Sequence, residues 1–242
     1  MISYNQKLVV SGNFFEFYQF QKHIHKGFQK AREDIEEFSE KTPRVITMNW
    51  HKSQFALTRT RRNIRRLINA NPALNKFLTL TFAENVCDIN IANYEFKKFV
   101  KRLKFYYPQL NLQYLAVIEF QKRGAVHYHM VLNIPKINSK KLSELWGNGF
   151  IKINRIKSCD NLGAYISKYL SKESTERLFN KKKFFYSRNL EKPKEFLDTK
   201  EIGLIEDFYQ LEKIKPTFES TFENEHVGKV YYKQFQIKSM GI

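Results

Sequence analysis

The sequence contains few cysteines, no long apolar run and no low-complexity segment. Cys87 and Cys159 are the only two cysteines among 242 residues, and no Cys-x-x-Cys spacing occurs. This argues against a zinc ribbon or a disulfide scaffold and fits a reducing cytosol. Nowhere do about 18 apolar residues run together, and the N-terminus contains no signal-peptide core. We therefore expect a soluble protein of the cytoplasm.

Acidic residues are scarce relative to basic ones. The chain has 42 Lys and Arg against 24 Asp and Glu, which gives a formal net charge of +18. This excess indicates a polyanionic partner, nucleic acid before membrane. Aromatic residues make up 15% of the chain. Most are expected in the core, and some can stack on unpaired bases.

The chain is long enough to bury one core with extensions. In the first part, residues 7–21 predict a β-hairpin that turns at Ser11-Gly12-Asn13, and an acidic stretch covers residues 30–40. The acidic stretch at 201–212 indicates no particular role. Three parts are expected: an N-terminal extension with hairpin and helix (1–57), a core (58–190) and a C-terminal accessory segment (191–242).

Hydrophobic periodicity predicts alternating strands and helices within the core. Leu78 and Leu80 share one face of the first strand, which is expected to be half-exposed. The order of elements predicts an α+β fold, with helices on a central antiparallel sheet of about five strands. The strands are expected at 76–82, 114–121, 125–132 and 150–156, and the helices at 58–70, 94–106, 139–146 and 161–172.

The helix expected at 58–70 is rich in arginine. Ile64, Leu67 and Ile68 form its apolar stripe. A phosphate-binding face and a solvated charged face fit the remaining pattern equally well. The arginines concerned are Arg59, Arg61, Arg62, Arg65 and Arg66.

The two central strands are joined by Lys122-Arg123-Gly124, which matches a three-residue hairpin loop with glycine at a positive φ. If Gln121 pairs with Ala125, Glu119 lies opposite His127. His129 then shares their face, with Gln121 beside it. The other face is apolar and belongs to the core; it holds Ala116, Ile118, Phe120, Val126, Tyr128, Met130 and Leu132.

Glu119, His127 and His129 form a set of ligands suited to one divalent cation. Three protein ligands leave positions open for a phosphate oxygen and water. The ligand types suit zinc as well as manganese or magnesium. For the histidines alone, exposure at a polar surface is the more common explanation.

The helix expected at 161–172 combines phenols and ammonium groups. Tyr165, Lys168, Tyr169 and Lys172 fall at i, i+3, i+4 and i+7, so they share one face. A phenol becomes a useful nucleophile beside cations that favour phenolate and neutralise a phosphate, and Lys168 is suited to both tasks. Packing aromatics with solvated lysines are the alternative.

Three segments resemble, in order, the three motifs of the HUH superfamily of rolling-circle replication initiators. They are FLTLTF, VIEFQKRGAVHYHMVL and NLGAYISKYLSK, and the resemblance covers about residues 75–175. The residue between the two histidines, hydrophobic in that family, is Tyr128 here. The flanking segments resemble initiators of small plasmids from low-GC Gram-positive bacteria. The resemblance implies a ferredoxin- or RRM-like sheet.

The resemblance also implies a single-stranded DNA endonuclease and strand transferase that acts at a replication origin with Mn²⁺ or Mg²⁺. Tyr165 matches the nucleophile, which would leave a 5′-phosphotyrosine and a free 3′-hydroxyl primer. Lys168 would stabilise developing charge. Tyr169 matches the second tyrosine of two-tyrosine phage proteins, which can take the termination cleavage, or it is a packing aromatic. Gln121, Lys172 and the arginines are expected to bind DNA.

Partners and competing functions follow from what is absent. No Gly-x-x-x-x-Gly-Lys-Ser/Thr phosphate loop occurs, so a host helicase is expected to unwind the origin, whose cleaved strand we expect to form a hairpin. Monomer and homodimer both stay open. Relaxases generally have a third histidine in this cluster, which is absent here.

Two other functions compete with the initiator. A non-catalytic RRM-like module would use the histidines and tyrosines to stack on bases. Glu119 discriminates against it, because stacking needs no carboxylate opposite a histidine. A hydrolase that uses water would turn over without a covalent adduct.

Overall fold

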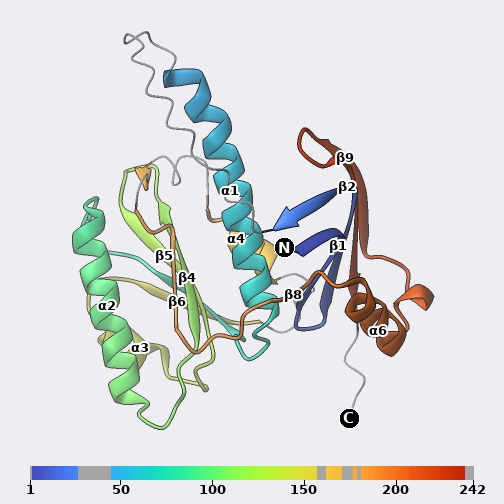
Figure 1. Cartoon of the computed structure of the whole chain (residues 1–242). Helices are drawn as coiled ribbons and strands as arrows, with labels where there is room; N and C mark the ends of the chain where they lie inside the picture. The colour runs from blue at the N-terminus through green and yellow to red at the C-terminus, as the bar shows by residue number, and fades with distance from the viewer. Residues whose placement is uncertain (1, 27–44, 157–161, 171–176, 179–180, 238–242) are drawn as a thin grey trace. The chain divides into compact units, whose positions relative to one another are not determined.

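The computed structural model describes residues 2–26, 45–156, 162–170, 177–178 and 181–237, and the chain divides into two compact units (Figure 1). Unit 1 contains residues 1–44 and 192–242, and unit 2 contains Val45–Glu191. Each unit contains a five-stranded antiparallel sheet. The predicted α+β class is confirmed. Cys159, Lys172 and the acidic stretch at 30–40 lie outside the described residues.

The sheet of unit 1 combines strands from both ends of the chain, in the order β8-β1-β2-β10-β9. The predicted hairpin is confirmed, since Ser11 pairs with Phe14 across a turn at Gly12 and Asn13. The sequence-based division treats residues 1–57 and 191–242 as separate segments, whereas here their strands pair. The elements are β1 (Ile2–Ser11), β2 (Phe14–Lys26), β8 (Lys194–Phe196), α6 (Thr199–Tyr209), a 3-10 turn (Leu211–Lys213), β9 (Phe218–Asn224) and β10 (Gly228–Gln236).

The acidic stretch at 201–212, for which no element was predicted, lies mainly in helix α6. Asp198 caps this helix by accepting hydrogen bonds from two backbone N–H groups. Ile202 and Leu211 are buried in an apolar cluster with Leu8 and Phe15 of the sheet. The acidic residues around them hid this apolar contact in the sequence.

Unit 2 contains the predicted central sheet, in the order β6-β3-β5-β4-β7. The succession β-α-β-β-α-β from β3 to β6, with this strand order, is that of ferredoxin-like folds. The elements are α1 (Val45–Asn69), β3 (Lys76–Leu80), α2 (Ile89–Tyr106), β4 (Tyr114–Phe120), β5 (Val126–Leu132), α3 (Ser139–Trp146), β6 (Ile151–Arg155), α4 (Leu162–Ser167) and β7 (Phe184–Tyr186).

Two helices begin earlier than predicted. Helix α1 begins at Val45 rather than at residue 58, and no glycine or proline interrupts the added residues. Helix α2 begins at Ile89, directly after Asp88, whose side chain accepts a hydrogen bond from a backbone N–H of the first turn. No helix in the described part of the chain is long and apolar enough to cross a membrane.

Helices cover both faces of the sheet in unit 2 (Figure 1). Helices α2 and α3 pack on one face, where Leu78 and Leu80 are fully buried. Helices α1 and α4 cover the other face, and Phe77 is buried there with only 7% exposure. The prediction of a half-exposed first strand was therefore wrong, because these two helices cover the face that alternation alone left open.

The central hairpin has the predicted register. Glu119 pairs with His127 and Val117 with His129, and Gly124 has a φ of +88° in the loop. The opposite, apolar face packs into the core as predicted. There the ring of Tyr128 stacks on Phe96, with centroids 4.5 Å apart.

Helix α4 is shorter than predicted. Its last α-helical residue is Ser167, and the chain continues through tight turns to Leu170, each closed by a bond between residues three apart. The guanidinium of Arg61 donates two hydrogen bonds to the carbonyl of Leu170, at 2.8 and 3.1 Å. This side chain satisfies a carbonyl at the end of the segment. Tyr169 therefore lies in a turn.

Candidate metal centre and nucleophile

The three predicted metal ligands lie together on the sheet face covered by α1 and α4. Glu119 comes from β4, and His127 and His129 come from β5. One ligand atom from each lies within 4.8 Å of the others. The two histidines are only 6% and 5% exposed, while Glu119 is half-buried. The hairpin thus brings the whole predicted set to one point.

The chemistry of this cluster fits a divalent cation. Nε2 of His127 is buried and has no hydrogen-bond partner among the described residues. Burial without a partner is costly for a polar nitrogen, and a cation would satisfy it. Two imidazoles and a carboxylate suit zinc, manganese or magnesium. The donor set therefore predicts a metal site without specifying the metal.

The electrostatics favour the metal-binding protonation states. The hydrogen bond with His129 lowers the pKa of Glu119, despite the opposing effect of burial. Burial lowers the pKa of His127, and the neighbouring His129 lowers it further. A deprotonated carboxylate and a neutral imidazole are the forms that bind cations. The site is consequently prepared for a metal at neutral pH.

Thr79 of β3 is a member of the site that sequence reasoning missed. It pairs with His129 across the β3–β5 ladder, and its Oγ1 lies 3.3 Å from Nδ1 of that imidazole. The other ring nitrogen, Nε2, lies 2.5 Å from the Glu119 carboxylate. Thr79 and Glu119 together orient the ring, and such partners orient metal-bound histidines. Only the pairing of β3 with β5, which was not predicted, could have shown this contact.

The two tyrosines of the α4 segment lie beside the histidine cluster. The ring of Tyr169 stacks on His129, with centroids 3.6 Å apart and planes at 19°. Its hydroxyl is 2.8 Å from the hydroxyl of Tyr165. Phe77 packs against both tyrosines. A contact chain thus runs from the metal-ligand candidate to Tyr165, which is 42% exposed.

The two phenols differ in their surroundings. Burial raises the pKa of Tyr169, and the hydrogen bond to Tyr165 raises it further. Tyr169 therefore keeps its proton and can donate it toward the oxygen of Tyr165. Its ring is packed on an imidazole, whereas Tyr165 projects to solvent. The more accessible nucleophile is Tyr165.

A glycine sets the position of this segment. A Cβ added at Gly163 would lie 2.7 Å from Cα of Arg65 in α1 and 2.8 Å from its carbonyl oxygen. Only glycine permits so close an approach of the two backbones. Ile166 and Leu170 are fully buried beneath α1. Tyr165 is thereby attached to a rigid support.

Residues 75–174 match the family model for replication-associated proteins that is named after ORF2 and the gene 2 protein. The matched segment contains all of the predicted catalytic and metal-binding residues. It lies wholly within unit 2 and begins after α1. The match supports a role in replication initiation. Comparison with curated proteins and with solved structures found no match.

The remaining predicted DNA-binding residues divide into exposed and packed ones. Arg59 and Arg62 are exposed, as is Lys168. Arg61 bonds the carbonyl of Leu170, and Arg66 is only 8% exposed. Arg65 is half-buried, with its backbone against Gly163. The arginines do not form one outward face, and Arg59 and Arg62 are the ones that solvent reaches most easily.

The predicted contact residue Gln121 lies in an open pocket beside the ligands. The pocket has a volume of about 710 Å³ and is lined by Glu119, His127 and the hairpin loop. Nε of Arg123 donates a hydrogen bond of 2.9 Å to Oε1 of Gln121. Arg123, which sequence reasoning did not select, therefore brings a positive charge to the edge of the metal site.

Proposed function

We propose that this chain is a rolling-circle replication initiator of the HUH type, which nicks single-stranded DNA at an origin. One observation carries the proposal. The exposed hydroxyl of Tyr165 is joined through Tyr169 to His129, so a phenol that substrate can reach lies beside a His-His-Glu cluster. The family-model match supports the same role. The resemblance of the flanking segments favours a small plasmid of a Gram-positive host.

In the proposed reaction, the oxygen of Tyr165 attacks a phosphodiester of the origin strand. The new bond joins this oxygen to phosphorus, and the bond from phosphorus to the 3′ oxygen breaks. The phenol loses a proton and the departing 3′ oxygen gains one, so the product is a 5′-phosphotyrosine and a free 3′-hydroxyl. The reverse reaction rejoins the strand, because the energy of the phosphodiester is retained.

The protein side chains would divide the remaining tasks. A divalent cation, Mn²⁺ or Mg²⁺, held by the His-His-Glu cluster would polarise the scissile phosphate. Lys168 would neutralise charge that develops there. Tyr169, by donating its hydroxyl proton, would orient the oxygen of Tyr165. Arg59, Arg62, Gln121 and Lys172 would bind the DNA strand on either side.

Unwinding would require a partner. The sequence contains no phosphate loop of the Walker type, so a host helicase would separate the strands in the cytoplasm. A hairpin at the origin would present the scissile phosphate in single-stranded form. The enzyme would then supply the primer and the helicase the movement.

A non-catalytic RRM-like module is the second candidate, because the strand order of unit 2 is compatible with it. RRM modules bind RNA on an open sheet face through stacked aromatics. Here α1 and α4 pack on the face that contains His127 and His129. A covered face with an unsatisfied buried imidazole favours the enzyme.

The test is incubation with a single-stranded origin oligonucleotide and Mn²⁺, followed by denaturing electrophoresis. Wild-type protein is expected to form a denaturant-resistant DNA adduct. Tyr169→Phe is expected to form it as well, and Tyr165→Phe is expected to form none. An adduct that persists in Tyr165→Phe would overturn the assignment of the nucleophile. Absence of cleavage by the wild type on all origin hairpins would favour the binding module.

The third ligand is tested by metal titration of Glu119→Ala in the same cleavage reaction. Loss of one ligand is expected to shift the midpoint to higher metal concentration. Glu84→Ala, which removes an exposed carboxylate of the same unit, serves as the control. An unchanged midpoint in Glu119→Ala would refute its role as a ligand.

A further inference from the structure

The outward face of helix α2 contains a stripe of lysines and aromatics that the proposed active site does not use. Phe105 is 88% exposed and Tyr94 is 59% exposed. The spacing of the stripe places its members on one side of the helix. The buried residues of α2, such as Phe99 and Leu103, lie on the other side. The stripe consists of Tyr94, Lys97, Lys98, Lys101, Lys104 and Phe105.

This stripe lies on the far side of the sheet from the metal cluster. Helix α2 packs on the face that holds Leu78, Leu80 and Tyr128, whereas His127 and His129 point to the opposite face. Figure 1 shows α2 and α3 on one side of this sheet and α4 on the other. DNA bound at the stripe would therefore be separate from the phosphate being cut.

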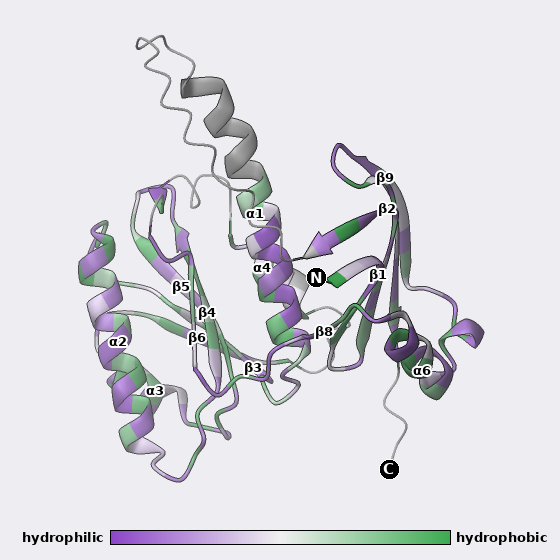
Figure 2. Ribbon diagram, viewed as in Figure 1, coloured by the Kyte–Doolittle hydropathy of each residue, from purple (hydrophilic) through white to green (hydrophobic). Residues whose placement is uncertain are grey.

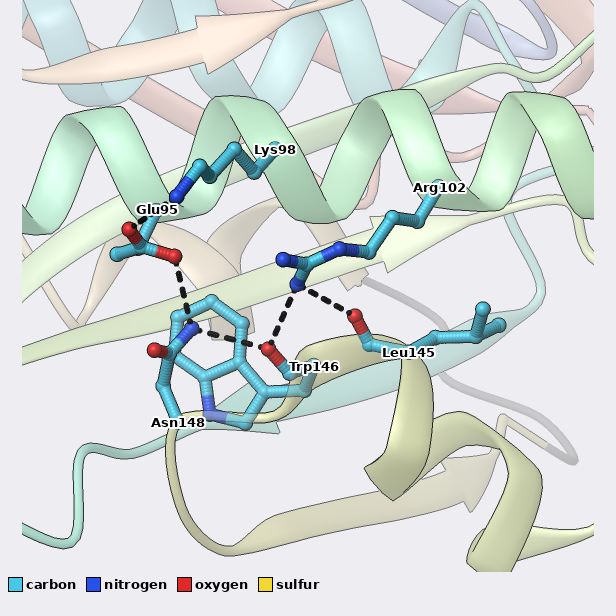
Figure 3. A network of polar contacts seen from close by, with 6 residues as sticks. All are labelled: Glu95, Lys98, Arg102, Leu145, Trp146 and Asn148. Atoms are coloured by element: carbon cyan, nitrogen blue, oxygen red, sulfur yellow. Dashed lines mark hydrogen bonds and ion pairs between the residues drawn. The ribbon is translucent and has the colours of Figure 1, made fainter.

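The positive charge of the stripe is not neutralised within the protein. Glu95 is the one acidic residue of α2, and its carboxylate turns toward α3, where it accepts hydrogen bonds from Lys98 and Asn148 (Figure 3). Among the described residues, Lys97, Lys101 and Lys104 form no ion pair. Like charges three and four residues apart repel one another on a helix. A bound polyanion would relieve this repulsion.

The helix that carries the stripe is firmly attached. Nη1 of Arg102 donates hydrogen bonds to the carbonyls of Leu145 and Trp146 at the end of α3, at 3.0 and 3.1 Å (Figure 3). Figure 2 shows hydrophilic and hydrophobic residues alternating along α2. The inward residues bury the helix against the sheet. The stripe is therefore a rigid surface, which costs little conformational entropy to use.

The charge of the whole chain is concentrated in the unit that contains this helix. Residues 45–191 contain 27 Lys and Arg and 9 Asp and Glu, whereas the rest of the chain contains 15 of each. The entire net charge of +18 therefore belongs to unit 2. A polyanion is expected to bind there and not on unit 1.

The aromatics decide which polyanion fits. Phe105 and Tyr94 can stack on unpaired bases while the neighbouring lysines contact phosphates. A duplex hides the faces of its bases and would leave Phe105 without a partner. We propose that the outward face of α2 is a second binding surface for single-stranded DNA, which holds a strand away from the cleavage site. The choice of DNA over RNA rests on the proposed function.

The lysines are tested with the triple variant Lys97→Glu/Lys101→Glu/Lys104→Glu in the full chain. The probe is a labelled oligonucleotide of 30 thymidines, and anisotropy is measured over a range of salt concentrations. Three lost phosphate contacts are expected to reduce the slope of log K against log salt by about 2. The control reverses three exposed lysines of unit 1: Lys200, Lys213 and Lys215. Equal effects of the two triple variants would overturn the surface.

The aromatics are tested with Phe105→Ala. The matched control is Phe208→Ala, which removes a 77% exposed phenylalanine from unit 1. Loss of one stacked base is expected to weaken single-strand binding roughly tenfold in Phe105→Ala, with duplex binding unchanged. No loss, or an equal loss on duplex, would contradict the proposal.

Adduct formation on a short origin oligonucleotide separates this proposal from the proposed function. The triple lysine variant is expected to form the adduct at the wild-type rate when the oligonucleotide is saturating. If the wild type forms no adduct but the lysine variant still loses single-strand affinity, the second surface stands and the nuclease fails. If adduct formation is normal but affinity is unchanged, the second surface fails alone.

Discussion

Both units expose large aromatic side chains, but the charges around these side chains differ. In unit 2, exposed Phe105 lies within a run of lysines, and 27 basic residues outnumber 9 acidic ones. In unit 1, Phe208 follows Glu206 and Asp207, and 15 basic residues are matched by 15 acidic ones. Exposure of an aromatic alone therefore does not indicate DNA binding. The surrounding charge assigns that task to unit 2.

Buried polar groups differ between the units as well. Glu16 of unit 1 is 2% exposed and accepts a hydrogen bond of 2.9 Å from the hydroxyl of Tyr232. His127 of unit 2 has a buried nitrogen with no partner among the described residues. The hydroxyl of Ser11 in unit 1 also lacks one there, but no group of further ligand atoms surrounds it. The unsatisfied group of unit 2 is the one that awaits a cation.

The largest effect is expected from His127→Ala. Loss of a ligand removes several kcal/mol of charge stabilisation, so adduct formation should slow about a thousandfold. Single-turnover cleavage with Mn²⁺ measures this. His226→Ala, at an exposed histidine of unit 1, should leave the rate unchanged. Wild-type cleavage by His127→Ala would remove the functional contrast between the units.

Gly163→Ala tests the support of the nucleophile. The added Cβ would meet the backbone of Arg65 at 2.7 Å, which should destabilise unit 2 by about 1–3 kcal/mol. Displacement of Tyr165 should slow cleavage further. Gly203→Ala in α6 is the control, because nothing lies within 4 Å of its added Cβ. Denaturant unfolding that shows equal effects at both sites would contradict the close approach of α1 and α4.

Tyr232→Phe tests whether unit 1 is purely structural toward the chemistry. The variant leaves the buried carboxylate of Glu16 without one donor, so unfolding should become easier by about 1–3 kcal/mol. Adduct formation on a short oligonucleotide should not change. A large loss of cleavage, with the fold retained by circular dichroism, would show that unit 1 takes part in the reaction.

Thr79→Val tests the orientation of His129. Removal of the hydroxyl that contacts Nδ1 should weaken metal binding about tenfold to a hundredfold. Calorimetric titration with Mn²⁺ measures the affinity. Thr221→Val, on an exposed strand of unit 1, provides a substitution of the same chemistry. A metal affinity equal to that of the wild type would exclude a role for Thr79.

The smallest effect is expected from pH on the metal-free protein. Burial lowers the pKa of His127 in the folded state, so the unfolded chain takes up the proton first as pH falls below about 6.5. The stability contributed by neutral His127 is present above that pH and is lost as pH falls through the lowered folded-state pKa. In chelator, the free energy of unfolding should depend less on pH in His127→Ala than in the wild type. Equal dependence would contradict the shift.

Local sequence was sufficient to predict the hairpin and its ligands. Side chains alternate with a period of two, and the loop containing Gly124 sets the register, so the positions of Glu119, His127 and His129 followed from neighbouring residues alone. Helix α1 was found through its apolar stripe, although its start was not. These features depend on contacts close in sequence.

Contacts between distant residues could not be predicted in the same way. The early end of α4 depends on Arg61, which is 109 positions from Leu170. The stacking of Tyr169 on His129 depends on how α1 and α4 dock on the sheet. Strand β10 pairs with β2 from the other end of the chain. None of these has a local signal, because each is determined by tertiary packing.

The central claim is that Tyr165 is the nucleophile of the metal site. Mass spectrometry of a trypsin-digested adduct tests it directly, since cleavage after Lys168 places Tyr165 and Tyr169 on different peptides. The 5′-phosphate is predicted on the peptide that ends at Lys168. A nucleotide on the peptide that begins at Tyr169 would contradict the claim.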